Sequence, residues 1–480
     1  MRKFPIVILI CVLMLSLTTH LYFALSIVLS VVIFYCMLDK FGKGIVLLET
    51  MAFYSCVIYL IMPLLGYAVY NRQSRISMIW KKLMPVPYET YYSFILPSIC
   101  VYILGLFLLS YMHGRVDEGE RIDNLIKAIK GQLSFRPKTG VILIVSGICF
   151  YFIKVLTPGP LAAVANFGYL LIFPGLLYVH YQPKFKGKMW IYLLVSFFFI
   201  RDALNTGMFT VSFYMSLTIV SFFLLQKKIR FPVKLLAVAG AVSALFVLQL
   251  VKGSFRKSTW KDNYAGSRTE LFQNLIVERA SNFNQIFSEE TFFPIYVRLN
   301  QGWTTALVIR RIPAVQPYDG GASIVSTMAA SIIPRVLWPD KPESGGVYNM
   351  QHFAGFRIKG WSVNIGPVGE AYGNFGINGG ILYMFFFGLC IGWAYTAIFR
   401  LSRKTPLLIL WIPLLFFEVT YCMENDTLQA MNSFIKAAVF IWLLRKLFPS
   451  LFINRNKINS AANKNSAHLR DNRPGWSLPG

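Results

Sequence analysis

Runs of about 20 apolar residues recur along almost the whole chain, and they restrict its fold more than any other feature. A helix needs about this length to cross the hydrocarbon core of a bilayer. Irregular polar backbone is tolerated only outside the lipid or beside a watery cavity. The pattern predicts an all-α polytopic membrane protein with about twelve transmembrane helices. The predicted spans are 4–19, 21–38, 45–69, 91–111, 139–156, 165–181, 189–204, 207–225, 233–251, 376–399, 406–422 and 428–448.

Composition supports this class and bears on the partners. Hydrophobic residues make up 56% of the 480, and the mean hydropathy is +0.54. The formal net charge is +26. Nucleic-acid-binding proteins are also basic, but their cations gather on a soluble face. Here Lys and Arg lie in short loops between apolar runs, which is the positive-inside pattern. We therefore expect membrane lipids and no nucleic acid as partners.

The basic loops also predict the orientation. With both termini in the cytoplasm, all but one of the short basic loops fall on the inner side. The exception is 71–90, which carries Arg72, Arg75, Lys81 and Lys82 on the outer side. Either this loop is an interfacial amphipathic helix, or the span count is wrong nearby. The N-terminal run is interpreted as a retained first span, because no clear cleavage site follows it.

Four regions follow from this topology. Residues 1–251 form a bundle of about nine helices, and 376–448 supply about three more. Between them, 252–375 is a large extracytoplasmic segment in which cations outnumber acids. The tail 449–480 is polar and basic, which predicts a disordered cytoplasmic end. The seven cysteines form no CxxC pair and are interpreted as buried hydrophobes, so we expect no metal site and no cofactor.

Candidate side chains in the outer segment begin on 291–312, which is predicted to be one interfacial helix. Arg298, Gln301 and Thr305 fall on one face at helical spacing, toward a substrate cavity or simply toward the interface. The next stretch, SIIPRVLWPDKPE, contains three prolines that stiffen the backbone around Arg335 and Lys341. Rigidly held cations suit a diphosphate, because the groups that donate hydrogen bonds to it are in position before it binds. The alternative is a proline-rich turn with solvated charges.

Ionisable groups near the predicted membrane boundary are the remaining candidates. Glu370 and Tyr372 lie between glycines in GPVGEAYGNFGINGG, where a carboxylate is costly unless paired or used. Glu370 is suited to accept a proton from a sugar hydroxyl, or it forms a structural salt bridge. Arg201 ends a predicted span, where it either functions or pairs with Asp202 or Glu418.

The stretches IIPRVLWPDKP and GEAYGNFGINGG resemble Wzy-type oligosaccharide repeat-unit polymerases, the O-antigen and exopolysaccharide polymerase family. The resemblance covers roughly 290–400, and the rest is similar only in topology and hydropathy. It implies a fold like that of the GT-C membrane glycosyltransferases. It also implies transfer of a growing chain from undecaprenyl pyrophosphate to an incoming lipid-linked unit, at the outer face of the bacterial cytoplasmic membrane.

On this resemblance the substrates are lipid-linked donor and acceptor oligosaccharides, and a chain-length regulator and a flippase are the accessory partners. The reaction needs no metal if cations neutralise the leaving group. The expected pyrophosphate ligands are Arg335, Lys341, Arg298, Arg357 and Arg201. Glu370 is the expected base, followed by His352 and Asp340, while Gln301 and Tyr372 orient the substrate.

Two other functions fit the sequence. An O-antigen ligase shares the chemistry and differs in the acceptor. A transporter or flippase belongs to another class, which shows broken helices and charged groups near the bilayer midplane. The chain instead concentrates its polarity at one predicted outer end, which favours an enzyme.

Overall fold

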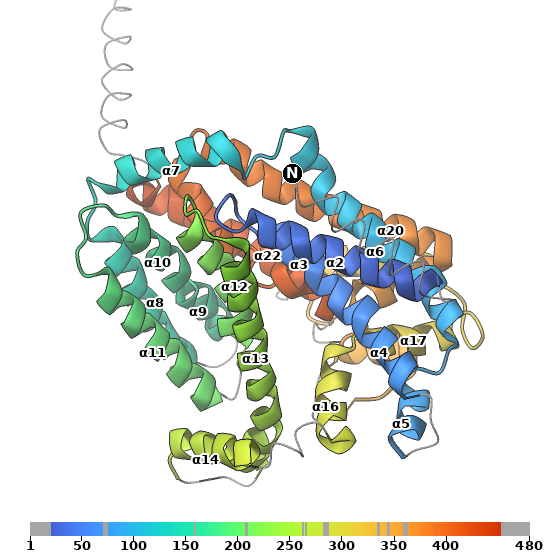
Figure 1. Cartoon of the computed structure of the whole chain (residues 1–480). Coiled ribbons are helices and arrows are strands. Elements are labelled where there is room, and N and C mark those ends of the chain that lie inside the picture. The colour runs from blue at the N-terminus through green and yellow to red at the C-terminus, as the bar shows by residue number, and fades with distance from the viewer. Residues whose placement is uncertain are drawn as a thin grey trace, which may run out of the picture. The chain divides into compact units, whose positions relative to one another are not determined.

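The computed structural model describes residues 21–70, 75–157, 160–206, 210–261, 264, 266–281, 288–333, 337–342, 346–358 and 363–452. These described residues are helical and contain no strand, apart from two isolated β-bridges at Gly44. The predicted all-α class is therefore confirmed (Figure 1). The tail from 453 and the first predicted span lie outside the described residues.

The α-helices of the first half lie between Leu21 and Arg256. They are α2 Leu21–Lys40, α3 Leu47–Cys56, α4 Met62–Val69, α5 Arg75–Leu83, α6 Tyr88–Met112, α7 Gly119–Leu133, α8 Thr139–Leu156, α9 Pro160–Tyr169, α10 Ile172–Tyr181, α11 Lys188–Thr206, α12 Thr210–Leu224 and α13 Phe231–Arg256. A π-helix, η1 Val57–Ile61, joins α3 to α4, and a second, η2 Lys257–Lys261, follows α13.

The second half contains shorter helices and then two long ones. Its elements are α14 Arg268–Ser281, α16 Glu289–Leu299, α17 Gly302–Arg311, α18 Ala322–Ile332, α19 Val347–Ala354, α20 Gly366–Ser402, α21 Ile412–Leu415 and α22 Thr427–Leu447, with 3-10 turns η3 Pro406–Trp411, η4 Val419–Glu424 and η5 Pro449–Leu451.

Nine of the described segments are long and apolar enough to cross a bilayer, which makes the chain a multi-pass membrane protein. Each corresponds to one of the predicted spans. They are Leu21–Lys40, Leu47–Val69, Tyr88–Met112, Thr139–Leu156, Val164–Tyr181, Phe231–Thr259, Gly366–Ser402, Pro406–Glu424 and Thr427–Leu447. The predicted spans 189–204 and 207–225 correspond to α11 and α12, which are helical but not among the nine, so twelve spans stays a prediction.

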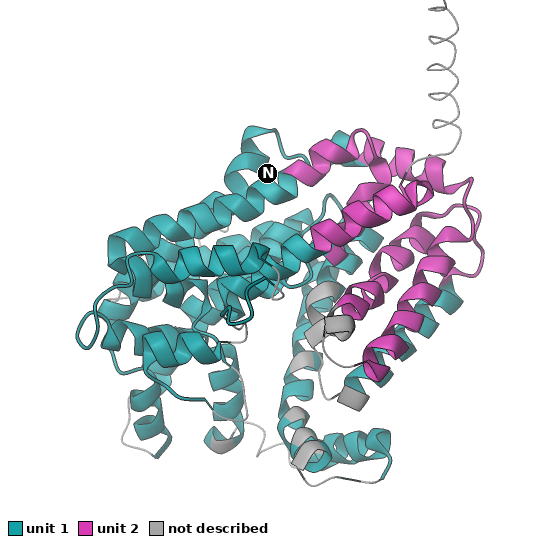
Figure 2. Ribbon diagram, turned by 180° about the vertical axis from the view of Figure 1, so that it is seen from behind, with its two compact units in different colours: residues 1–122, 189–396, 415–436 teal, residues 123–188, 397–414, 437–480 magenta. Residues whose placement is uncertain are grey.

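The chain divides into two compact units whose segments interleave along the sequence (Figure 2). Unit 1 comprises 1–122, 189–396 and 415–436, and unit 2 comprises 123–188, 397–414 and 437–480. In unit 2, Tyr178 donates its hydroxyl to the Leu451 carbonyl at 2.7 Å and accepts from the Trp411 indole at 3.2 Å. These bonds connect η5 and η3 to α10.

In unit 1, the π-helix η1 supplies backbone acceptors to two other elements. The wider π turn shifts carbonyl groups out of the regular α pattern. The Ile58 carbonyl accepts from the Gln301 N–H at 3.1 Å. The next two carbonyls, of Tyr59 and Leu60, accept from the hydroxyls of Tyr91 and Tyr92 at 3.0 and 2.7 Å. The π-helix thereby ties α6 and the start of α17 to the membrane bundle.

The long helix α20 is broken at Gly376, whose φ of 66° and ψ of −155° are accessible mainly to glycine. The break frees carbonyl groups that would otherwise accept within the helix. Those of Gly373 and Asn374 accept from the N–H groups of Asp319 and Gly320 at 3.1 and 3.0 Å. Residues 377–402 alone exceed the about 20 residues that a span needs, so the break falls at the end of a span, where the sequence predicts it.

The structure differs from the prediction of a single helix over 291–312, which is wrong. Helix α16 ends at Leu299 and α17 begins at Gly302, because Asn300 is not helical, with φ −92° and ψ 89°. The amphipathic helix proposed for 71–90 is present as α5, with Trp80 buried. The cysteines are free where described, but four are exposed rather than buried, because they lie on the outer faces of apolar helices: Cys36, Cys100, Cys149 and Cys390.

Candidate functional site

The candidate site is built around α18, whose two ends are both fixed by hydrogen bonds. The turn before it uses positive φ at Gly320 and Gly321, 61° and 95°, which suits glycine. Its C-terminal end is capped by Lys341, whose ammonium donates to the carbonyls of Ala330 and Ile333 at 2.9 and 3.0 Å. A cation is favourable there, because it meets the negative end of the helix dipole. Lys341 thus has a structural role.

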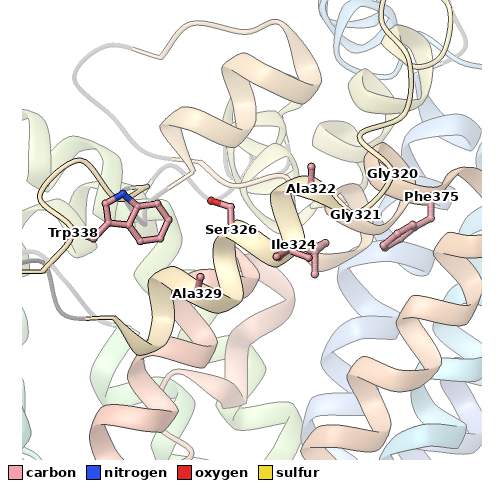
Figure 3. Close-up of a pocket in the computed structure, with 9 residues that line it drawn as sticks. Gly320, Gly321, Ala322, Ile324, Ser326, Ala329, Trp338 and Phe375 are labelled. Carbon is pink, nitrogen blue, oxygen red and sulfur yellow. The ribbon is translucent and has the colours of Figure 1, made fainter.

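One side of α18 borders an open groove of about 770 Å³. Its lining is apolar apart from Ser326 and includes Ile324 and Ala329 from the helix. Figure 3 shows Phe375 at the Gly320–Gly321 end and Trp338 toward the Ala329 end. Large apolar grooves bind apolar ligands, because burial of hydrocarbon is worth roughly 25 cal/mol per Å².

The other side of α18 borders a small polar cavity of about 40 Å³. Ser323, Thr327, Tyr348, Asn349 and Asp426 contribute its hydrogen-bonding groups. The hydroxyl-bearing Ser326 lines both the groove and the cavity, so one helix separates an apolar surface from a polar one.

Glu370 lies at the centre of the hydrogen bonds behind this cavity. Its side chain is 3% exposed and accepts from the Asn349 side chain at 3.0 Å and from the Thr427 N–H at 3.1 Å. These bonds join α20 to α19 and to the first turn of α22. Both donors are neutral N–H groups, so among the described residues no salt bridge of the predicted kind holds Glu370 in place.

Asp426 is the second buried acid of the site, and it is not among the residues predicted from the sequence. Its carboxylate accepts from the Gln429 N–H at 2.6 Å and from the Gly346 N–H at 3.2 Å. The first bond makes Asp426 the N-cap of α22. The available signal was local: Asp and Thr directly precede the apolar run at 428–448, as helix caps do.

His352 faces Asp319 at the more accessible part of the site. Its Nε2 lies 2.9 and 3.0 Å from the two carboxylate oxygens, and the two side chains are 34% and 18% exposed. The His352 ring stacks on Tyr348, with centroids 5.4 Å apart and planes 9° apart. The Asp319 N–H donates to the Gly373 carbonyl in the broken helix α20. The break in α20 therefore positions Asp319, and Asp319 in turn orients His352.

Three further candidates make defined contacts. Arg298 donates to Glu424 at 2.9 Å, with its own side chain 48% exposed. Gln301 is buried and donates to the Asn364 carbonyl at 2.5 Å, so it fastens α17 to the segment before α20. Tyr372 packs between Phe94 and Tyr318, with centroids 5.0 and 6.0 Å away.

The structure does not gather every predicted residue. It brings Glu370 and His352 into one cluster, because Asn349 and His352 share α19. Asp340, Arg357 and Arg201 are exposed and are not joined to this cluster by any described contact. Arg335 lies outside the described residues. Among the described side chains, no group of three His, Cys, Asp or Glu residues is placed to hold a metal ion.

Comparison with known proteins adds one match. The profile of a family described as a domain of unknown function (DUF8712) matches residues 129–398. This range includes α18, α19 and the first part of α20. No curated protein and no solved structure matches the chain.

Proposed function

The chain belongs to the family described as a domain of unknown function (DUF8712), and we propose that it is a membrane glycosyltransferase acting on lipid-linked saccharides. Specifically, it joins oligosaccharide units carried on undecaprenyl diphosphate at the outer face of the cytoplasmic membrane. The proposal combines the resemblance of 290–400 to repeat-unit polymerases with the geometry around α18.

One observation carries the proposal: α18 presents an apolar groove and a polar cavity that meet at Ser326. A polyprenyl-linked saccharide needs both, because its chain is hydrocarbon and its head is rich in hydroxyl groups. Besides Pro342 and Leu428, the cavity is lined by hydroxyls, an amide and a carboxylate, the groups that hydrogen-bond sugars. In this assignment the polyprenyl chain lies in the groove and the sugar lies at its Ser326 edge, where its hydroxyl groups face the small polar cavity.

The reaction forms a bond between an acceptor hydroxyl oxygen and the donor anomeric carbon, and breaks the bond from that carbon to the diphosphate. The hydroxyl proton goes to a base. Geometry favours His352 as that base, since it is accessible and oriented by Asp319, as a general base requires. Glu370 already accepts hydrogen bonds from two N–H groups, so we assign it the role of positioning Asn349 rather than that of the base. The diphosphate leaves with its negative charges neutralised by cations, for which Lys341 and Arg335, both after α18 in the sequence, are the candidates.

Translocation of the same lipid-linked saccharide is the second candidate. The break of α20 at Gly376 favours it, because transporters use broken helices to build substrate sites. Against it, the spanning part of α20 is continuous after the break. An O-antigen ligase remains the alternative within the same chemistry.

The deciding experiment places the purified protein in liposomes with a defined lipid-linked oligosaccharide. A polymerase lengthens the saccharide, which a gel resolves, whereas a flippase only changes its sidedness, which a membrane-impermeant lectin reports. Extension without any change in sidedness supports the proposal; sidedness change without extension overturns it.

The groove assignment has its own matched pair of variants on α18. Ala329→Trp fills the groove, whereas Met328→Trp places the same ring on an exposed neighbour that does not line it. We expect the first to raise KM for the lipid-linked substrate at least tenfold and the second to leave it unchanged. Equal effects of the two substitutions would remove the groove from substrate binding.

A further inference from the structure

A second buried polar cluster in unit 1 is built from other elements than the α18 site. Lys40, the last residue of α2, donates to Glu49 on α3 at 2.8 Å and to Asp117 in the loop before α7 at 2.6 Å. The Tyr395 hydroxyl on α20 donates to the same Asp117 oxygen at 2.7 Å. The cluster therefore joins four segments that are far apart in the sequence.

The charges of this cluster do not balance. Lys40 and Glu49 are each 6% exposed and Asp117 is 1% exposed, so one buried cation faces two buried carboxyl groups. Glu118 lies 3.8 Å from Lys40, but it is partly exposed and has Arg115 at 3.5 Å. Asp39 pairs with Lys43 at the surface, at 2.7 Å. Neither neighbour supplies the missing positive charge.

Two carboxyl oxygens of the cluster are also buried without a hydrogen-bond partner in the described structure. They are Oε2 of Glu49 and Oδ1 of Asp117. A buried ionised carboxylate with a bare oxygen is strongly unfavourable, and such groups neutralise themselves by taking up a proton. A bare oxygen on an acid that carries a proton costs much less.

We propose that this cluster is a proton-binding site, in which Glu49 carries the proton while Lys40 and Asp117 form the ion pair. Asp117 receives the shorter contact from Lys40 and a second donor from Tyr395, so its negative charge is better stabilised. Among the described residues, Lys40 is the one whose side chain donates to the Glu49 carboxyl group. The ligand is a proton, and the site is independent of the proposed transferase activity.

Other charged or titratable groups surround the pair. On α13, Lys234 donates to the carbonyls of Leu38 and Asp39 at 2.8 and 3.2 Å, so it neutralises the end of α2 rather than the acids. The remaining groups are Cys36 and Asp39 on α2, Lys43 in the following turn, Arg115 and Glu118 beside Asp117, and Tyr395 on α20. Lys43 and Arg115, the cations among these remaining groups, are both exposed.

Proton occupancy has a structural consequence, because the same residues hold two loops together. Gly44, after α2, forms a β-bridge with Glu118, next to Asp117. Loss of the proton leaves a second buried negative charge beside Lys40 and loosens this junction. Under the predicted orientation the junction faces the cytoplasm, so it senses the proton activity of that compartment.

Infrared difference spectroscopy on the full-length protein in nanodiscs tests the proposal. At neutral pH we expect the carboxylic C=O band of a protonated buried acid in the wild type, shifted by deuterium oxide. It should be lost in Glu49→Gln, which keeps the shape of the protonated acid. It should remain in Asp39→Asn, which removes a carboxylate from the nearby exposed pair. An undiminished carboxylic C=O intensity in Glu49→Gln overturns the proposal, because other buried acids such as Glu370 contribute equally to both spectra.

Stability measurements distinguish a bound proton from a bound metal cation. Glu49→Gln should melt at the same temperature as the wild type near pH 4 and increasingly above it as the pH rises to neutral, because the unfolded wild type releases a proton that its folded state holds. If Asp117→Asn, rather than Glu49→Gln, removes the infrared band, the assignment to Glu49 is overturned. So is proton binding itself, if replacing sodium and potassium by choline lowers the melting temperature of the wild type but not of Glu49→Gln.

Discussion

His352 Nε2 lies 2.9 Å from Asp319 Oδ2, and Asp319 is in turn held by the carbonyl that the break in α20 exposes. A histidine, an acid and a backbone distortion from three separate segments thus form one unit. The arrangement fits the role proposed for His352, a base whose ring orientation is set by a carboxylate. Through this unit, the break in α20 fixes the position of a partly accessible imidazole.

Removing either member of this pair should abolish most of the proposed activity. We expect His352→Gln to lower kcat by about 10²–10⁴-fold, the usual contribution of a general base. Asp319→Asn should lower it less, since it leaves the imidazole in place. Extension of a lipid-linked saccharide measures both. His113→Gln is the matched control, because His113 contacts the Leu109 carbonyl within its own helix turn, away from the α18 site. Wild-type rates in well-folded His352→Gln would eliminate it as the base.

Glu370 should matter for stability as well as for activity. Glu370→Ala leaves the Asn349 amide and the Thr427 N–H without an acceptor in a buried place. Each such loss costs about 1–3 kcal/mol, so the melting temperature in detergent should fall by several degrees. The exposed Glu120 on α7 provides the comparison, and Glu120→Ala should change stability by less than about 0.5 kcal/mol. Equal melting temperatures for the two variants would contradict the central place given to Glu370.

Gly376 should not tolerate a side chain. Alanine at φ 66° and ψ −155° costs roughly 1–3 kcal/mol, and its Cβ would lie 3.0 Å from the Tyr318 ring. We expect the Gly376→Ala protein to be less stable and to extend the lipid-linked saccharide slowly, because Asp319 loses its hydrogen bond to the Gly373 carbonyl. A Cβ at Gly240 in α13 would meet no atom within 4 Å, and Gly240→Ala should gain up to about 1 kcal/mol. Thermal denaturation of the pair in one detergent compares them, and a neutral Gly376→Ala would argue against a required break.

The contact between Arg298 and Glu424 separates structure from substrate binding. The Arg298 side chain is half exposed, so the coupling energy of the pair should stay below about 1 kcal/mol in a double-mutant cycle. Exchanging the two charges, with Arg298→Glu and Glu424→Arg together, should restore stability. If Arg298 also binds the diphosphate, the exchanged protein stays inactive. Recovery of both stability and activity would leave Arg298 a purely structural residue.

The segments that cross the membrane follow from the sequence, because their signal is local. About twenty apolar residues are enough to predict a span, whatever the rest of the chain does. The same holds for the amphipathic helix α5 and for the end of a span near Gly376, where glycines interrupt the apolar run. Glu370 and His352 were also recognisable as candidates, since ionisable groups close to a span are costly and need a reason.

Only the tertiary structure decided which of these residues meet. Glu370 and Thr427 are separated by 57 positions, and Lys40 and Asp117 by 77. No periodicity records such pairs, because they depend on how helices pack and on where a π turn or a broken helix leaves carbonyl groups free. In the sequence Asp426 looks like an ordinary helix cap, and only the packing of α19 and α20 beside it shows that it belongs to the candidate site. Sequence determines where this chain enters the membrane, whereas packing determines which buried charges must share a partner or a proton.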